Sequence, residues 1–113
     1  MDCIFCKIVA GEIPSKIVFE DDKVIAFNDI SPAAPVHILI IPKKHINSAL
    51  TLSDDDYDVI SSIFKTAVRL AKEFNIAEDG FRIVNNCGKN GGQTVEHLHF
   101  HLIGGRCLTW PPG

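Results

Sequence analysis

The clearest pattern of apolar and polar positions lies in residues 54–74. Apolar residues recur there at steps of three and four, which places them on one face of an α-helix. These positions are Tyr57, Ile60, Phe64, Ala67, Val68, Ala71 and Phe74. Just upstream, Ser53 and Asp56 have the spacing of a capping box, with Asp in place of the usual Glu. We therefore predict one long amphipathic helix, which Asn75 or the nearby Asp79-Gly80 ends.

The first half of the chain shows the patterns of extended segments. Two runs rich in β-branched residues, 16–20 and 23–28, flank Asp21-Asp22 and predict a hairpin. Residues 37–42 are apolar on both faces, which is typical of a central strand. The proline-containing residues 29–35 predict a loop between the hairpin and this strand.

The last two predicted strands flank a glycine-rich turn. We expect the first at residues 81–86, the turn at 88–92 and the second within 93–101, with the two strands paired antiparallel. A short helix over residues 3–10, capped by Asp2, precedes the hairpin. The predicted fold class is therefore α+β, with an antiparallel sheet of about five strands covered by one long helix.

The composition is that of one globular domain spanning residues 1–113. The formal net charge is -3, which argues against a protein that coats nucleic acid through its general field. The chain lacks a run of roughly 20 apolar residues that would span a membrane, and its start does not resemble a signal peptide. We therefore expect a cytoplasmic protein with neither nucleic acid nor membrane as a partner.

The tail at residues 106–113 predicts neither a helix nor a central strand. Its only large anchor is Trp110, which is the sole tryptophan of the chain. This side chain either seals the core of its own domain or docks on a partner subunit.

Three of the five histidines fall at every second position, as His97, His99 and His101. An extended backbone sends alternate side chains to opposite faces, so the three imidazoles share one face while Leu98 and Phe100 point to the core. A solvated histidine cluster is one interpretation, but the glycine-rich turn before the segment and the apolar residues after it disfavour this. A metal site and a site for phosphate chemistry are the other two.

The middle histidine of such a strand, His99, is the best candidate for a nucleophile. A neutral imidazole attacks phosphorus when its other nitrogen donates a hydrogen bond that fixes the tautomer. Neutral donors next to His99 come from the side chains of Asn86, Gln93 and Thr94. The backbone N–H groups of Gly91 and Gly92 can surround a phosphate beside it.

Cys3 and Cys6 form a C-x-x-C pair, which supplies two of the four ligands of a tetrahedral zinc ion. Without an export signal, these thiols are more typical of metal ligands or free thiols than of a disulfide. His45 and His97 are the candidates for the other two ligands, which predicts one closed structural site per chain. The alternative is a pair of reduced thiols in an N-terminal helix.

Long segments of the chain resemble a known family. H-L-H-F-H-L-I at residues 97–103 matches the histidine triad signature, and the similarity continues through A-F-N-D-I-S-P-A-A-P-V-H-I-L-I-I-P-K-K-H-I at 26–46 and G-G-R-C-L-T-W-P-P-G at 104–113. The chain is similar to the Hint branch of the HIT family, and Cys3 and Cys6 resemble those of a zinc-bearing, bacterial-type member.

This resemblance implies a HIT-like fold and a homodimer whose two sheets join, with the tail at 104–113 reaching the partner. It also implies an enzyme that binds purine nucleoside monophosphates and hydrolyses phosphoramidates such as adenosine 5'-monophosphoramidate without a catalytic metal. His99 matches the nucleophile that becomes nucleotidylated, His101 the residue that contacts the phosphate and assists the leaving group, and His37 the outlying fourth histidine. His97 completes the triad.

The resemblance also assigns the remaining site residues. Asp29 matches the acceptor for the ribose hydroxyls, and Phe27 and Ile30 match the wall of the base pocket. Phosphate and leaving-group contacts correspond to Asn86, Gln93 and Thr94, and Trp110 corresponds to a tail residue that reaches the partner's site. The zinc ligands of the wider family correspond to Cys3, Cys6, His45 and His97.

Three positions depart from the common Hint pattern. Thr94 replaces the usual Ser, Cys87 stands where an acidic residue is frequent, and Glu96 adds a negative charge near the entrance, which bears on the choice of leaving group. Three alternatives stay open: a nucleotide-binding regulatory or scaffold protein with incidental turnover, a dinucleoside polyphosphate hydrolase, and a metalloenzyme that uses the histidine triad as ligands.

Overall fold

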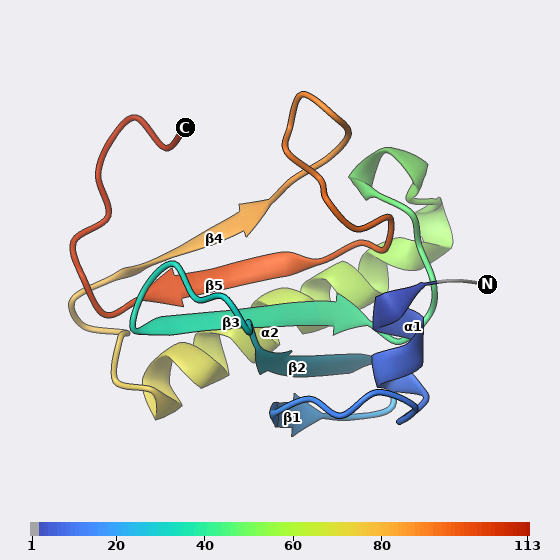
Figure 1. The fold of residues 1–113 in the computed structure, drawn as a ribbon, viewed down its shortest axis with the longest axis horizontal. Coiled ribbons are helices and arrows are strands. Elements are labelled where there is room, and N and C mark those ends of the chain that lie inside the picture. Colours follow the sequence, from blue (N-terminus) through green and yellow to red (C-terminus); the bar gives the residue numbers. More distant parts are fainter. Residues whose placement is uncertain (1–2) are drawn as a thin grey trace.

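The computed structural model describes residues 3–113, so the predicted helix cap Asp2 lies outside the described residues. Within them, the α-helices and strands in chain order are α1 (Ile4–Val9), β1 (Ile17–Glu20), β2 (Val24–Asn28), β3 (Val36–Pro42), α2 (Tyr57–Glu73), β4 (Phe81–Asn85) and β5 (Phe100–Gly104). The strands form one antiparallel sheet in the order β1-β2-β3-β5-β4 (Figure 1). The predicted α+β class with five antiparallel strands, one long helix and one short helix is confirmed.

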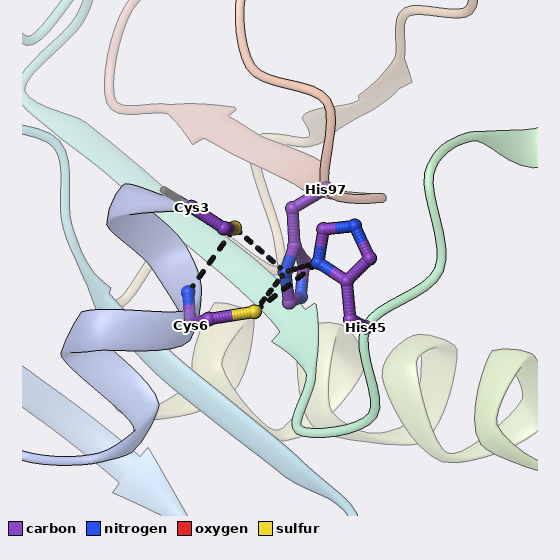
Figure 2. A group of neighbouring side chains, drawn as sticks. All are labelled: Cys3, Cys6, His45 and His97. Carbon is purple, nitrogen blue, oxygen red and sulfur yellow. Dashed lines mark hydrogen bonds between the residues drawn. The ribbon is translucent and has the colours of Figure 1, made fainter. Parts of the chain in front are cut away.

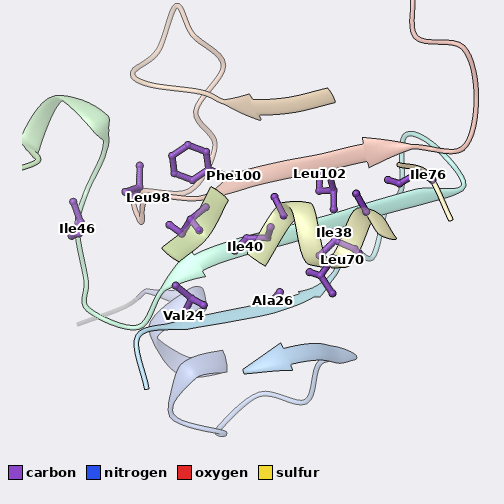
Figure 3. Close-up of a cluster of buried hydrophobic side chains, with 13 residues drawn as sticks. Val24, Ala26, Ile38, Ile40, Ile46, Leu70, Ile76, Leu98, Phe100 and Leu102 are labelled. Carbon is purple, nitrogen blue, oxygen red and sulfur yellow. The ribbon is translucent and has the colours of Figure 1, made fainter. Parts of the chain in front are cut away.

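Helix α2 crosses one face of the sheet and builds the main core (Figures 1 and 3). From the helix the core takes Ile63, Ala67, Leu70 and Ala71, and from the sheet side Val24, Ala26, Ile38, Ile40, Leu98, Phe100 and Leu102. Strand β3 is buried over almost its whole length, as the apolar run predicted for a central strand requires.

The helix boundaries follow the predicted signals, but the predicted apolar face of α2 is partly wrong. Asp56 accepts the Ser53 N–H at 3.0 Å in the predicted capping box, which begins a 3-10 turn leading into the helix. Asn75, at φ 60°, follows the C-terminal end of α2. Among the predicted core positions, four are instead exposed: Tyr57, Phe64, Val68 and Phe74. The buried face is centred on Ile63 and Leu70. Tyr57, Phe64 and Val68 form an exposed apolar stripe beside it, where the Phe64 ring still meets Phe100 at a centroid distance of 5.9 Å.

Helix α1 covers part of the other face of the sheet (Figure 1). Its N-cap is Cys3, whose Sγ accepts the Cys6 N–H at 3.3 Å. Phe5 and Ile8 pack against alternate residues of β2 and β3, namely Ile25, Phe27, Leu39 and Ile41, and form a second, smaller core. The short helix therefore brings both cysteines to the sheet face opposite α2.

The predicted histidine strand is shorter than expected and begins only at Phe100. His97 and His99 lie in the connection before it. The Leu98 N–H donates to the carbonyl of Ile46 at 2.6 Å instead of to a neighbouring strand, and the side-chain amide of Asn85 donates to the His99 carbonyl at 2.9 Å. The backbone therefore leaves the sheet before Phe100, and the connection from β4 is longer than the glycine turn at residues 88–92.

The predicted alternation of faces nevertheless holds through this irregular segment. Leu98 belongs to the core beneath α2. The rings of His97 and His99 contact Phe5 of α1, and His101 pairs in register with Leu39, which faces α1. All three imidazoles therefore lie on the side of the sheet away from α2.

Among the residues that the structure describes, no helix combines the length and apolarity needed to cross a membrane.

Candidate active site and metal cluster

Four predicted ligands from three separate segments meet beside helix α1 (Figure 2). Nδ1 of His97 lies 3.3 Å from Sγ of Cys3 and 3.5 Å from Sγ of Cys6. Nδ1 of His45 lies 3.1 Å from Sγ of Cys6 and 3.2 Å from Nδ1 of His97. All four ligand atoms lie within 4.8 Å of one another. The structure thus joins the C-x-x-C pair, the histidine after β3 and the first histidine of the triad.

The hydrogen bonds around both histidines show that this cluster suits a metal ion. Nε2 of His97 lies 2.9 Å from the Pro42 carbonyl, and Nε2 of His45 lies 2.7 Å from Oδ1 of Asn47. These oxygens only accept, so each Nε2 carries the proton and each Nδ1 turns a lone pair toward the thiols. Tetrahedral zinc, with bonds of about 2.0–2.3 Å, separates its ligands by about 3.3–3.8 Å. The observed spacing of the cluster is close to this range.

Without a cation, the thiol of Cys6 keeps its proton. Burial, together with a hydrogen bond and a charge interaction with Cys3, raises the pKa of the Cys6 thiol to about 11. Burial lowers the pKa of His97, so its imidazole stays neutral. Binding of a metal ion therefore requires loss of thiol protons, which makes the affinity of this cluster pH-dependent.

His99 is held in one tautomer by the backbone. Its Nδ1 lies 2.7 Å from the carbonyl oxygen of His97, so Nδ1 carries the proton and Nε2 keeps a free lone pair. The ring is 4% exposed and meets the edge of Phe5, with a centroid distance of 5.1 Å and an interplanar angle of 82°. The hydrogen bond that fixes the tautomer of His99 is therefore made to the backbone carbonyl of His97, two positions earlier.

His37 and His101 form a hydrogen-bonded pair whose proton positions follow from the backbone. The Ala33 N–H donates to Nδ1 of His37 at 3.0 Å, so the proton of this imidazole lies on Nε2. That proton points at Nδ1 of His101, 2.9 Å away, and Oδ2 of Asp29 is 3.4 Å from the same Nε2. Nδ1 of His101 therefore accepts, and Nε2 of His101 carries an N–H that is free to donate.

The pKa of His101 agrees with this arrangement. Burial first, then the neighbouring His99 and His37, lower the pKa of His101 to about 4, against a smaller opposing effect of Asp29. His101 is therefore neutral at physiological pH and presents a hydrogen-bond donor rather than a fixed positive charge.

A second group of possible metal ligands, made of Asp29, His37 and His101, does not have the proton arrangement of a metal site. Its ligand atoms lie within 4.8 Å of one another. However, Nδ1 of His37 already accepts from Ala33, so its Nε2 bears a proton and has no lone pair for a metal ion. Each cluster contains two histidines, but Nδ1 of His45 and of His97 keeps a lone pair directed at its cluster, whereas Nε2 of His37 carries a proton directed at its cluster.

The structure gives no support to a metal site built from the histidine triad. Among residues 3–113, two groups of possible metal ligands come together. His97 belongs to one group and His101 to the other, and neither contains His99. The metalloenzyme alternative therefore lacks a common point at which the three rings converge.

The predicted phosphate-binding amides hold the loop before the histidines. Asn86 donates to the Gly91 carbonyl at 2.6 Å. The side-chain amide of Gln93 donates to the carbonyls of Asn47 and Val95 at 2.7 and 3.0 Å. This loop is therefore tied to the segment that carries His45, and direct contacts of Asn86 and Gln93 with a phosphate stay predictions.

Gly92 and Thr94 lie in the same loop. Gly92, at φ +80°, donates its N–H to the Lys89 carbonyl at 3.1 Å. Thr94 is exposed and, with Glu96, lines a hollow of about 520 Å³ beside Cys3 and His45. Their predicted contacts with phosphate and leaving group are likewise untested by the geometry.

The residues predicted to contact the nucleoside differ in exposure. Phe27 is buried and meets Phe5 edge-on at 5.6 Å. Ile30 and Trp110 are 97% and 83% exposed, so Trp110 does not seal the core of its own domain.

Phe5 is the main residue of the site that the sequence analysis missed. It lies between the two cysteines in sequence and contacts the rings of His97, His99 and Phe27. The sequence signal for Phe5 was its position inside the C-x-x-C motif, because the helix that brings Cys3 and Cys6 to His97 also buries Phe5 beside the histidine segment, while Ile4 stays exposed.

Comparison with known proteins agrees with the fold and with the cluster of Cys3, Cys6, His45 and His97. The family model of the HIT domain matches residues 10–108, so the chain belongs to the HIT family. It is 51% identical to a HIT family hydrolase from Legionella pneumophila Philadelphia 1, whose crystal structure superimposes with a TM-score of 0.97, covering 99% of this chain and 100% of that one.

Two plant proteins are also similar over nearly the whole chain. Adenylylsulfatase HINT1 of Arabidopsis thaliana is 52% identical over 97% of this chain and 76% of its own length. The 14 kDa zinc-binding protein of Brassica juncea is 48% identical over 99% of this chain and 100% of its own length. The cluster of Cys3, Cys6, His45 and His97 is consistent with a zinc-bearing member of the family.

Proposed function

We propose that this protein is a nucleotide hydrolase that cleaves purine nucleoside phosphoramidates. The observation that carries the proposal is the 2.7 Å hydrogen bond between Nδ1 of His99 and the His97 carbonyl, which leaves Nε2 of His99 unprotonated. A neutral imidazole in this tautomer is a competent nucleophile toward phosphorus. The similarity to a HIT family hydrolase supports the reaction class.

In the proposed reaction, Nε2 of His99 attacks the phosphorus atom and forms a bond to it while the bond from phosphorus to the leaving amine breaks. The electron pair of the broken bond leaves with the amine, which takes up a proton from solvent, and the water that attacks in the second step returns a proton to solvent. A water molecule then attacks the same phosphorus, releases the nucleoside monophosphate and returns His99 to its neutral form. The sum consumes one water molecule, and no metal ion takes part.

His101 and His37 would act through the proton positions described above. The free N–H of His101 donates to a phosphate oxygen or to the leaving group, and His37 holds His101 in that tautomer. The neutral donor stabilises charge that develops on oxygen without competing with His99 for a proton.

The nucleotide would lie on the sheet face away from α2. Asp29 would accept from the ribose hydroxyls, and its carboxylate lies 3.4 Å from Nε2 of His37 at the start of the loop after β2. Phe27 and Ile30 would contact the base. Phosphate and leaving-group contacts would come from Asn86, Gly92, Gln93 and Thr94.

We also propose that residues 1–113 form a single HIT domain that works as a homodimer. Strand β4 lies at an edge of the sheet, which can extend into a partner's sheet. Nearby, α2 exposes Tyr57, Phe64 and Val68, and apolar surface of this kind is typical of an interface. The exposed Trp110, in the tail at residues 104–113, would then reach the partner's site.

A structural zinc ion, one per chain, is the proposed occupant of the cysteine and histidine cluster. The two unprotonated Nδ1 atoms and the tetrahedral spacing support it, as does the name of the Brassica juncea relative. The ion would hold α1 against the histidine segment.

The proposal is tested with adenosine 5'-monophosphoramidate. Wild-type protein should release adenosine monophosphate and ammonia, and His99→Ala should reduce kcat by about 10⁴-fold or more with an unchanged circular dichroism spectrum. Rapid quenching into alkali followed by mass spectrometry should show nucleotidylated protein only when His99 is present. Turnover that persists in His99→Ala would refute the covalent step. Saturable binding with negligible turnover in the wild type would favour the scaffold alternative.

A second candidate substrate class is an adenylyl group with sulfate as the leaving group. The 52% identity to a protein named adenylylsulfatase favours it. The same attack by His99 would release sulfate in place of an amine. Comparing kcat/KM for adenylyl sulfate and for the phosphoramidate in one preparation decides between the two leaving groups.

A further inference from the structure

The loop between β2 and β3, residues 29–35, controls the environment of His37. Apart from His101, the polar partners of the His37 ring come from this loop: the Ala33 N–H at 3.0 Å and the Asp29 carboxylate at 3.4 Å. The tautomer of His37 therefore depends on where the loop places Ala33.

Ala33 is held from its other side by Arg106, in the segment that follows β5. Nε and Nη2 of Arg106 both donate to the Ala33 carbonyl, at 3.2 and 2.9 Å, while Nη1 donates to the Cys107 carbonyl at 3.0 Å. The planar guanidinium thus donates two hydrogen bonds to the Ala33 carbonyl, and a third hydrogen bond holds it to its own segment.

The backbone at Gly105 allows Arg106 to make these hydrogen bonds to Ala33. Gly105 has φ +94°, and a Cβ atom built on it would lie 2.9 Å from Cβ of Pro35. The segment after β5 therefore packs directly against the loop, at a distance that a larger residue would not allow.

We propose that Arg106 is a positioning residue for the histidine pair, because it fixes the Ala33 N–H that sets the tautomer of His37. The chain of contacts runs from the Arg106 guanidinium to the Ala33 carbonyl, from the Ala33 N–H to Nδ1 of His37, and from Nε2–H of His37 to Nδ1 of His101. If Ala33 moves, the proton of His37 is no longer confined to Nε2. His101 then loses the donor that keeps its own N–H directed at the substrate.

Arg82 provides a matched control. It is also an arginine that donates to a backbone carbonyl, but its Nη2 bonds Thr109 of the tail at 2.8 Å rather than the loop. Arg82→Gln should loosen the tail and leave Ala33 in place. Arg106→Gln removes the paired hydrogen bonds from the guanidinium to the Ala33 carbonyl.

The first readout is nuclear magnetic resonance of the histidine side-chain nitrogens in the metal-loaded full chain. The proposal expects Arg82→Gln to keep the wild-type ¹⁵N shifts of His37 and His101. In Arg106→Gln, the His37 shifts should move toward the average of the two tautomers, and the signal of its Nε2–H should broaden through exchange with water. Unchanged shifts in Arg106→Gln would overturn the proposal, and so would equal changes in Arg82→Gln.

The second readout rests on the proposed function. With adenosine 5'-monophosphoramidate, kcat of Arg106→Gln should fall about tenfold with KM within twofold of wild type. Arg82→Gln should keep kcat within about twofold of wild type, and the loosened tail that carries Trp110 affects KM alone. A rise in KM with unchanged kcat would show that the loop serves binding only, and would overturn the positioning role. If the wild type does not turn over the substrate, the proposed function fails, and the nitrogen shifts still decide the role of Arg106. If Arg106→Gln does not fold, Arg106→Lys, which offers a single-headed donor, is compared by the same shifts and should show a smaller change in the same direction.

Discussion

The carbonyl of His97 accepts a hydrogen bond from Nδ1 of His99 at 2.7 Å, while the ring of His97 faces the thiols of Cys3 and Cys6. One residue thus contributes to two candidate sites: its side chain belongs to the cysteine and histidine cluster, and its backbone carbonyl orients the candidate nucleophile. The position of the carbonyl depends on where the ring is held. Changes at the cluster should therefore reach His99 without any contact between an ion and His99.

Removal of one thiol tests this coupling. Cys6→Ser should lose the bound zinc and lower the free energy of unfolding by about 3 kcal/mol, the effect of a ligand at 100 times its Kd. The melting temperature should fall by roughly 10 °C, and turnover should fall by no more than about tenfold, because the ion is not a reactant. Elemental analysis, calorimetry and phosphoramidate assays measure the three effects.

Cys107→Ser is the matched control, because Cys107 is exposed and lies outside the cluster. It should keep one zinc per chain and the wild-type melting temperature. Zinc that remains bound in Cys6→Ser would contradict the assigned ligand set, and complete loss of turnover in a folded Cys6→Ser protein would contradict a structural role.

Phe5 is expected to position the nucleophile as well as stabilise α1. Phe5 and Ile8 lie on the same helix and are equally buried, at 7% and 8% exposure, but the ring contact with His99 belongs to Phe5. Truncating either to alanine should lower the free energy of unfolding by about 3 kcal/mol. Phe5→Ala should in addition lower kcat between about 10-fold and 100-fold, because the ring of His99 loses its packing partner.

Denaturant unfolding and steady-state kinetics on Phe5→Ala and Ile8→Ala separate these effects. Equal losses of kcat in both variants would show that the helix matters only as a whole. An unchanged kcat in Phe5→Ala would show that the hydrogen bond to His97 is sufficient to orient His99.

The sheet and the candidate metal ligands were predictable because both have local signals. Residue type and spacing single out Cys3, Cys6, His45 and His97, whereas their meeting also requires helix α1 to pack on the sheet face opposite α2. The face of the triad was also predictable, since alternation survives in the irregular segment around Leu98.

Other features depended on contacts that no local pattern encodes. The start of β5 at Phe100 follows from the hydrogen bond of Leu98 to Ile46, in a loop far away in sequence. The outward position of Phe64 and Val68 on α2 was missed because Ile63 and Leu70 give an equally good helical period on another face. The link from the Arg106 side chain to the Ala33 carbonyl is likewise long-range.

The exposed stripe of α2 yields a prediction about assembly. Val68 is 43% exposed on this stripe, and a glutamate there would place a charge in the proposed interface. Val68→Glu should therefore shift the protein from dimer to monomer at micromolar concentration in sedimentation velocity experiments. Leu50→Glu is the control, because Leu50 is 86% exposed on the turn before α2 and should leave the dimer intact. A monomeric wild type, or a dimeric Val68→Glu protein, would contradict an interface on this helix face.

The lowered pKa of His101 predicts how stability depends on pH. The imidazole has a pKa of about 4 in the folded protein and about 6.5 when unfolded, so the unfolded chain binds the extra proton first as the pH falls. The contribution of neutral His101 to the free energy of unfolding is therefore complete above about pH 6.5 and is lost progressively down to about pH 4. The ring is partly exposed, so solvent screening limits the loss to about 1–2 kcal/mol.

Comparison with His101→Asn isolates this effect, because Asn keeps an acceptor for His37 and does not titrate in this range. Urea unfolding at pH 7.5, 6.0 and 5.0 measures the free energy of unfolding of both metal-loaded proteins. Acid also weakens metal binding, but it does so in both proteins, so the difference between them reports His101. The stability of the wild type should fall more steeply with acid than that of His101→Asn, and parallel curves would show that His101 is not held neutral by its burial.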